Sequence, residues 1–226
     1  MKETIIISLG GSLIIPDNID IGFLKDFKKL ILSHVQKGKK FVIITGGGKI
    51  CRRYQDAAKA IVNASTEDLD WIGIASLKMN AELMRVIFAE FAHNEVIPNL
   101  SAHISFDKPV VIGSAYKPGL STDWDAVLAA KSLGAKKIIN LSNIDYVYDS
   151  DPKINPNAKK IEKISWAEYR KIIPKDWVSG LNSPFDPIAS ELAQKEGMEV
   201  VIMNGKPIDN LVKCLNGEKF TGTVIS

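Results

Sequence analysis

The stretch TIIISLGGS at residues 4–12 decides the fold class of this chain. Residues 4–9 form an almost unbroken apolar run, which is typical of a strand covered on both faces, as the strands of parallel sheets are. The glycine pair at positions 10 and 11 predicts a turn directly after that strand. A buried strand that ends in a glycine turn is a common start of an alternating strand and helix pattern. The stretch therefore predicts an α/β fold with a mostly parallel central sheet.

The same alternation of short β-branched runs and amphipathic segments continues along the rest of the chain. Further buried strands are predicted at residues 41–44, 109–112, 137–141 and 199–203, and an edge strand at 224–225. Helices are predicted at residues 20–35, from about residue 49, and at 67–92, 126–132 and 187–196. No linker, repeat or low-complexity tract divides these segments in the sequence. We therefore expect a single domain over residues 1–226.

Composition and charge narrow the classes of protein to which the chain can belong. Of its 226 residues, 46% are hydrophobic and 24% are charged, which excludes disorder as the main state. The formal net charge is only +3, so no nucleic-acid polymer is expected as a partner. The longest uncharged apolar stretch, residues 4–16, is too short to span a membrane, and no membrane partner is expected. Cys51 and Cys214 fit no disulfide framework or metal pattern, which favours a reducing cytoplasm.

Three predicted loops combine glycine with small hydroxyl residues where strands end: residues 10–12, 45–48 and 117–122. Glycine lets the backbone approach a phosphate closely, and the first amides of a following helix carry partial positive charge. Parallel strands end at the same edge of a sheet, so one site could use all three loops. The alternative is that these glycines only form turns. The chain contains neither the P-loop pattern nor GxGxxG, so both of those phosphate sites are disfavoured.

The loop that follows the predicted strand at 137–141 is aromatic and acidic. It contains Asn143, Tyr148 and Asp151 and ends at Pro152. A planar base can lie beside a tyrosine ring while amide and carboxylate groups bind its edge or its sugar. The alternative is a solvated turn in which Asp and Asn side chains bind their own backbone. The residues alone leave both interpretations open.

Five motifs, in this order, resemble the amino acid kinase superfamily, and within it the archaeal-type uridylate (UMP) kinases. They are Ser-Leu-Gly-Gly-Ser at 8–12, Gly-Gly-Gly-Lys-x-x-Arg-x-Tyr at 46–54, Asp-Trp-Ile-Gly-Ile at 70–74, Pro-Gly-x-x-Thr at 118–122 and Asn-x-Asp-x-Val-Tyr-x-x-Asp-Pro at 143–152. The resemblance extends to Gly222-Thr223 and so covers nearly the whole chain. The joint order of the motifs is far more specific than any single motif.

The resemblance implies a fold, a reaction and an assembly. The fold would be the amino acid kinase fold, a three-layer αβα sandwich, with a UMP-side lobe at about residues 1–135 and an ATP-side lobe at about 136–226. The reaction would be ATP-dependent phosphorylation of UMP to UDP in pyrimidine nucleotide biosynthesis. Mg²⁺ would be needed and would be held by ATP phosphates and water, so no residue is assigned as a metal ligand. The assembly would be a homo-hexamer, a trimer of dimers, in the cytoplasm.

The resemblance also implies roles for individual residues. The ATP phosphates would lie against Gly10, Gly11, Ser12, Gly48 and Arg52. The adenine and its ribose would lie among Ser142, Asn143, Tyr148 and Asp151. UMP would be held by Gly47, Asp70, Tyr116, Lys117, Pro118, Gly119, Leu120, Ser121 and Thr122, with the Asp70 carboxylate on the ribose hydroxyls. Asp125 would be the catalytic aspartate that orients cationic groups around the transferred phosphoryl group.

The chain departs from the family pattern at several positions. Ser8 and Val178 stand where many relatives carry lysine, and Lys49 and Lys175 are candidate substitutes. Tyr146 replaces a usual glycine, and residues 123–124 resemble a two-residue insertion in the acceptor loop. Because the net charge is small, the positive potential that phosphates need is expected locally, around Gly47, Lys49 and Arg52.

Two alternative functions remain open at this point. One is a superfamily kinase that acts on a carboxylate or a small alcohol phosphate. The other is a catalytically silent nucleotide-binding subunit, similar to the molybdenum-storage proteins, which the missing lysines at Ser8 and Val178 favour. Asp70 and the Pro118-Gly119 loop favour UMP over the first alternative.

Overall fold

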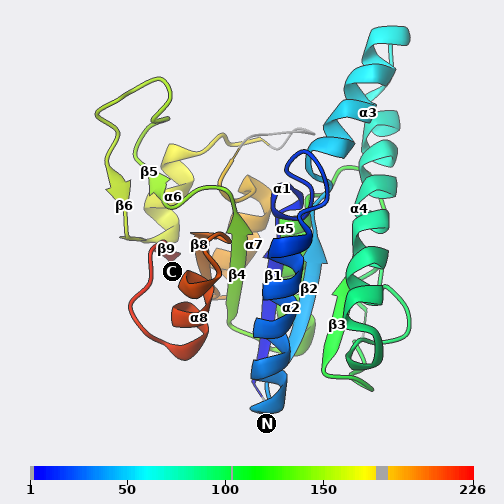
Figure 1. Cartoon of the computed structure of the whole chain (residues 1–226). Coiled ribbons are helices and arrows are strands. Elements are labelled where there is room, and N and C mark those ends of the chain that lie inside the picture. The colour runs from blue at the N-terminus through cyan, green and yellow to red at the C-terminus, as the bar shows by residue number, and fades with distance from the viewer. Residues whose placement is uncertain (1–2, 103, 177–182) are drawn as a thin grey trace.

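The computed structural model describes residues 3–102, 104–176 and 183–226. Its centre is a seven-stranded sheet with the order β3-β2-β1-β4-β8-β9-β7 (Figure 1). The first five strands in that order are parallel to one another. They are β3 (Val110–Gly113), β2 (Lys40–Thr45), β1 (Thr4–Leu9), β4 (Lys137–Ser142) and β8 (Glu199–Asn204). The prediction of a mostly parallel α/β sheet is confirmed.

The carboxyl-terminal strand departs from its prediction. β9 (Thr223–Ile225) pairs antiparallel with β8 and parallel with β7 (Lys163–Ile164). It is therefore an inner strand, and the prediction of an edge strand at 224–225 is wrong. β7 has only two residues, too few to show a pattern in the sequence. A separate antiparallel pair is formed by β5 (Val147–Tyr148) and β6 (Lys160–Ile161).

Helices cover both faces of the sheet, which confirms the three-layer αβα arrangement (Figure 1). One layer contains α1 (Gly11–Ile14), α2 (Ile21–Gln36), α4 (Thr66–Phe88) and α8 (Ile208–Asn216). The other contains α5 (Thr122–Leu133), α6 (Trp166–Ile172) and α7 (Pro187–Lys195). Neighbouring strand residues alternate between the layers, so Ile7 is buried in the first core and Ile6 in the second. α3 (Gly48–Ile61) has no buried residue and lies against α4.

The ends of the helices follow local capping. The predicted start of α2 is confirmed to within one residue, because the Asp20 side chain accepts a hydrogen bond from the Phe23 amide at 2.9 Å. α5 starts at Thr122, four residues before its prediction, because Ser121 caps it by accepting from the Trp124 amide at 3.1 Å. α4 ends at Phe88, before the predicted residue 92, because Ala89 has φ 43° and a short 3₁₀ helix, η1 (Ala89–Phe91), follows.

The parallel strands place several loops side by side. β1, β2, β3 and β4 all end at one edge of the sheet, so the loops that begin at residues 10, 46, 114 and 143 start next to each other. Among the described residues, no helix is long and apolar enough to cross a membrane.

Candidate active site

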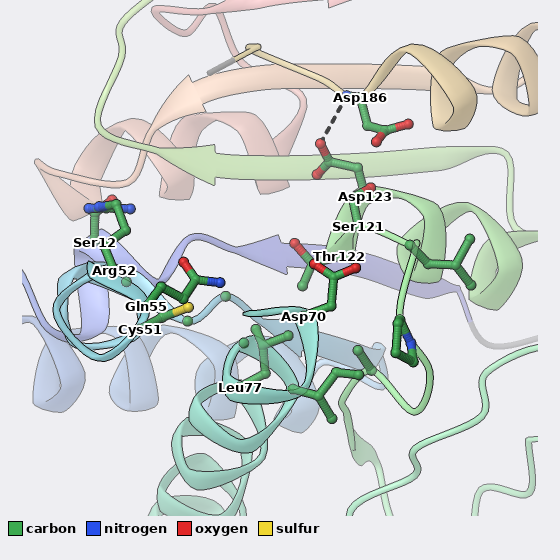
Figure 2. A pocket seen from close by; sticks show the side chains of 18 of the residues that line it. Ser12, Cys51, Arg52, Gln55, Asp70, Leu77, Ser121, Thr122, Asp123 and Asp186 are labelled. Carbon is green, nitrogen blue, oxygen red and sulfur yellow. Dashed lines mark hydrogen bonds between the residues drawn. The ribbon is translucent and has the colours of Figure 1, made fainter. Parts of the chain in front are cut away.

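A cleft of about 550 Å³ opens at the carboxyl edge of the parallel strands (Figure 2). Its walls combine the three loops that the sequence singled out with the start of α4 and the loop before α7. The predicted site residues that line it are Ser12, Gly47, Gly48, Arg52, Asp70, Lys117, Pro118, Leu120, Ser121, Thr122 and Asn143. Figure 2 shows Ser12 and Arg52 at one end of the cleft and Asp186 at the other.

Two of the glycine loops touch each other through their backbones. A Cβ atom added to Gly11 would lie 2.2 Å from the Gly48 nitrogen and 2.5 Å from the Gly46 oxygen. A Cβ atom at Gly46 would lie 2.6 Å from the Gly11 nitrogen. Gly48 has φ +70° and begins α3, a conformation that side chains rarely adopt. These glycines therefore have a packing role, and their approach also leaves the first amides of α3 beside the cleft.

Two cations line the cleft within the described part of the chain, Arg52 and Lys117. Lys49, a candidate substitute for the missing lysines, is instead bound to Asp17, with Nζ 2.8 Å from Oδ1. Arg53 contacts the same carboxylate at 3.6 Å. Lys175 is exposed and does not line the cleft. The local positive charge at the site therefore comes from Arg52 and Lys117 rather than from Lys49.

The acceptor loop between β3 and α5 is fastened to α4 by Asp70. The Gly119 amide donates a hydrogen bond to Asp70 Oδ2 at 2.8 Å. Gly119 has φ +82°, which suits glycine at this tight turn. Gln55 on α3 supports the same region, because its Nε2 donates to the Leu69 carbonyl at 2.9 Å. These two hydrogen bonds therefore hold the cleft wall in place on both sides of Asp70, whose second carboxylate oxygen stands at the cleft.

The carboxylate of Asp123 lines the cleft and is held by three neutral donors. Oδ1 accepts from Ser8 Oγ at 3.3 Å and from Asn140 Nδ2 at 2.9 Å. Oδ2 accepts from the Asp186 amide at 3.1 Å. Burial raises the pKa of Asp123 to about 7, while donation from the Asp186 amide lowers it and the Asp186 carboxylate raises it. Among the described residues, no cation forms an ion pair with Asp123.

The structure does not bring Asp125 to the cleft, in contrast to the prediction that it is the catalytic aspartate. Asp125 is 1% exposed and is absent from the residues that line the cleft. Neither of its carboxylate oxygens has a hydrogen-bond partner within the described ranges. Burial, followed by the charge of Asp123, raises the pKa of Asp125 to about 7. Asp125 is therefore a buried carboxyl group that lies behind the cleft wall containing Asp123.

The residues expected around adenine are only partly brought to this cleft. Asn143 lines it, whereas Ser142, Tyr148 and Asp151 do not. Asp151 is exposed, and its Oδ1 accepts from the Lys153 amide at 2.9 Å, as in an Asx turn. Gly10, Gly11, Tyr116 and Gly119 support the lining residues without lining the cleft. Val178 lies outside the described residues.

Two features of the site differ from the sequence analysis. Residues 123 and 124 belong to the first turn of α5 rather than to the loop before it, and their interpretation as a two-residue insertion stays a prediction. The signal that could have found this is Ser121 followed by acidic residues, which is typical of a helix start. The lining residues that sequence analysis did not assign are Gly46, Cys51, Gln55, Gly73, Ile74, Leu77, Ala115, Asp123, Ser183 and Asp186.

Comparison with known proteins agrees with this geometry. The chain matches the model described as "Amino acid kinase family" over residues 3–204. It is 32% identical over 225 residues to a uridylate kinase of Pyrococcus abyssi, covering 98% of each chain. It is 33% identical over 233 residues to a uridylate kinase of Thermoplasma acidophilum, covering 100% of this chain and 97% of the relative.

Solved structures show the same similarity. The crystal structure of uridylate kinase from Archaeoglobus fulgidus matches with a TM-score of 0.82 at 31% identity and covers 100% of both chains. That of UMP kinase from Ureaplasma parvum matches with a TM-score of 0.78 over 100% of this chain and 99% of that one. The identity to the second is 23%, so this likeness shows the fold alone.

Proposed function

Because the chain belongs to the amino acid kinase family, we propose that it transfers the γ-phosphoryl group of ATP to UMP and releases ADP and UDP, a step of pyrimidine nucleotide biosynthesis. The observation that carries the proposal is the cleft. Two touching glycine loops, Arg52, Asp70 and the acceptor loop meet around it. Relatives that match nearly the whole chain are named uridylate kinase, and these relatives lend no support to a silent subunit or a carboxylate kinase.

We assign the ATP phosphates to the glycine-loop side of the cleft. Ser12, Gly48 and Arg52 line this side, and Gly48 opens a 14-residue helix whose first amides are unpaired. Phosphoryl transfer requires little covalent chemistry from a protein, which instead aligns the two oxygens and stabilises spreading negative charge. The guanidinium of Arg52 supplies the positive charge, and the backbone amides orient the phosphate oxygens. Ser142, Tyr148 and Asp151 stay predictions for the adenine and its ribose.

We assign UMP to the side formed by Asp70 and the acceptor loop. The Asp70 carboxylate can accept hydrogen bonds from the ribose hydroxyls while its Oδ2 also holds the Gly119 amide. The other lining residues that we assign to UMP are Gly47, Lys117, Pro118, Leu120, Ser121 and Thr122. The cleft has room for parts of both nucleotides, which must meet for direct transfer. Asp123, which lines the cleft, takes the role that the sequence assigned to Asp125.

Mg²⁺ is the expected counter-ion of ATP in such a reaction. The described residues contain no group of three or more His, Cys, Asp or Glu side chains that could hold a metal ion. The residues present therefore fit an ion that stays on the phosphates, where it would neutralise their charge. Asp123 and Asp186 are the carboxylates that line the cleft besides Asp70.

The proposed setting is a homo-oligomer in the cytoplasm, with residues 1–135 and 136–226 as two lobes of one domain around the shared sheet. Trp71, Met79 and Val86 are 49%, 61% and 61% exposed and follow one side of the 23-residue helix α4. Ile61 of the neighbouring helix α3 is 81% exposed. Such an apolar face supports packing against a second copy, and a hexamer of three dimers is the assembly we propose. Cys51 and Cys214 are free thiols, which fits a reducing compartment.

A coupled assay of ADP formation tests the function directly. Purified protein is supplied with ATP, Mg²⁺ and, one at a time, UMP, CMP, AMP, acetylglutamate and aspartate. We expect turnover with UMP and little with the others. Tight ATP binding without turnover of any acceptor would favour a silent subunit, and turnover of a carboxylate would favour the other kinase class.

A further inference from the structure

Asn140 and Ser8 are buried polar side chains that interrupt the apolar runs of two central strands, β4 and β1. They are register partners on β4 and β1, and they are 6% and 4% exposed. Burying an amide or a hydroxyl without a partner is unfavourable, so polar groups in such positions usually serve a specific contact. Here both donate to the same atom, Asp123 Oδ1. Two adjacent strands therefore hold one carboxylate at the cleft through two donors, Ser8 and Asn140, which we call the clamp.

The clamp stands in surroundings that otherwise disfavour a charged carboxylate. Asp125 on the same helix and Asp186 before α7 both add negative charge near Asp123. From α6, the buried hydroxyl of Tyr169 faces the same group, and the charges of Asp123 and Asp186 are among the causes that raise its pKa. β1 and β4 contribute only the neutral Ser8 and Asn140.

We propose that Asn140, assisted by Ser8, is a positioning residue for the reaction: its hydrogen bond favours the charged form of the Asp123 carboxylate and fixes the direction of that group at the cleft, where none of the described cations is paired with it. This inference rests on the proposed phosphoryl transfer. Hydrogen bonds to a charged carboxylate favour that form over the neutral acid. The charged carboxylate then faces the same cleft as the two cations that line it, Arg52 and Lys117. Asn140 acts through Asp123 and does not itself line the cleft.

The contact distances rank the two donors. The Asn140 amide is 2.9 Å from Oδ1 and the Ser8 hydroxyl is 3.3 Å away, so Asn140 contributes the stronger hydrogen bond. Removing a donor raises the pKa of the carboxyl group because the charged form loses a stabilising contact. Activity that needs the charged form is then lost at low pH and recovered at high pH. A purely structural defect would lower activity equally at all pH values.

The test compares wild type with Asn140→Leu, Ser8→Ala and a matched control, Asn216→Leu. Asn216 also donates its amide to a carboxylate, Glu218 at 3.0 Å, on the surface. Carbon-13 NMR titration of the aspartate carboxyl groups follows Asp123 directly, with its signal assigned by its loss in Asp123→Asn. The second readout is kcat for UMP phosphorylation between about pH 5.5 and about pH 9.

We expect the Asp123 titration midpoint and the acid limb of kcat to rise together by about one pH unit in Asn140→Leu. The shift should be smaller in Ser8→Ala and absent in Asn216→Leu. An unmoved midpoint in both clamp variants, or a moved midpoint with an unmoved acid limb, would overturn the proposal. A wild type that titrates normally but does not phosphorylate UMP would instead refute the proposed function, while the midpoints still decide whether Asn140 sets the charge of Asp123.

Discussion

The contact between the two glycine loops makes Gly11→Ala the most informative single substitution for the architecture of the site. The new methyl group would lie 2.2 Å from the Gly48 nitrogen and 2.5 Å from the Gly46 oxygen, whereas non-bonded carbon contacts prefer about 3.5 Å or more. Both neighbours are backbone atoms, so no side-chain rotation relieves the overlap. The loops must separate by about 1 Å or more, and the whole cost falls on the backbone around the cleft.

The structure also shows what that separation would disrupt. The Gly10 amide donates to the Leu141 carbonyl at 2.8 Å, and the Gly46 amide donates to the Leu9 carbonyl at 2.8 Å. Overpacking typically destabilises by about 1–3 kcal/mol, and each weakened hydrogen bond adds about 1 kcal/mol. We expect a loss of about 3 kcal/mol or more. For a chain of this size that is a decrease in Tm of about 6–12 °C.

Gly134→Ala is the matched control for this measurement. Gly134 has φ +64° at the end of α5, and a Cβ atom there would meet nothing within 4 Å. Its cost is therefore the left-handed backbone alone, about 1 kcal/mol, or about 2–4 °C in Tm. Circular dichroism melts and urea titrations of both variants provide the comparison. If Gly11→Ala lost no more stability than Gly134→Ala, the loops would not be in the contact described.

Three further outcomes follow from individual contacts. Asp70→Asn should raise the KM for UMP by about tenfold to a hundredfold with a smaller effect on kcat, because it weakens a charge-assisted contact of about 1.5–3 kcal/mol. The control is Glu67→Gln, which changes an exposed acid on the same helix and should leave the KM for UMP unchanged. Tyr169→Phe should cost about 1–3 kcal/mol in urea unfolding, because the buried Phe185 amide, 2.8 Å from the hydroxyl, loses its acceptor; an unchanged midpoint would contradict this. Asp125→Asn should gain stability relative to wild type as pH rises from about 4 to about 7 and then hold that gain, by up to about 4 kcal/mol. The pKa of Asp125 is raised from 3.8 to about 7 in the fold, so over this range the folded wild type keeps a proton that the unfolded chain loses, and ionisation favours unfolding. If Asp125→Asn retains UMP turnover while Asp123→Asn loses it, the two aspartates have different roles. A gain in stability that does not depend on pH would contradict the interpretation of Asp125 as a buried acid.

Elements with strong local signals could be predicted from the sequence. β1 has the predicted bounds, because six apolar or small residues end at a glycine pair, and α2 starts at Ile21, one residue after its predicted start. β9 was misplaced because strand order depends on packing between distant segments, and residues 224–225 contain no information on their neighbours. α6 and α8 are absent from the predicted elements because they are short, with seven and nine residues. α6 does carry a start signal, Ser165 followed three residues later by Glu168, whereas α8 has no side-chain cap.

The candidate site likewise has parts that the sequence predicts from local motifs and parts that depend on contacts between distant segments. The glycine loops, Arg52, Asp70 and residues 117–122 belong to contiguous motifs, and these are the parts that the structure brings to the cleft. The contact of Asp123 with Asn140 and Ser8 joins three separate segments and depends on the register between β1 and β4. That register also makes Ser8 a hydrogen-bond donor to Asp123. The sequence therefore identified a missing lysine at Ser8 without showing what the serine does instead.

The charge balance of the cleft indicates where phosphate affinity must come from. Within the described chain, Asp70, Asp123 and Asp186 line the cleft against two cations, Arg52 and Lys117, while Lys49 and Arg53 are bound to Asp17. Two cations cannot balance three carboxylates as well as the phosphates of two nucleotides. The remaining positive potential must come from the unpaired amides at the start of α3 and from cations that the nucleotides bring with them. Nucleotide affinity should therefore depend more steeply on free Mg²⁺ than on the loss of Lys49, and binding of ATP to Lys49→Met across a Mg²⁺ titration measures that difference.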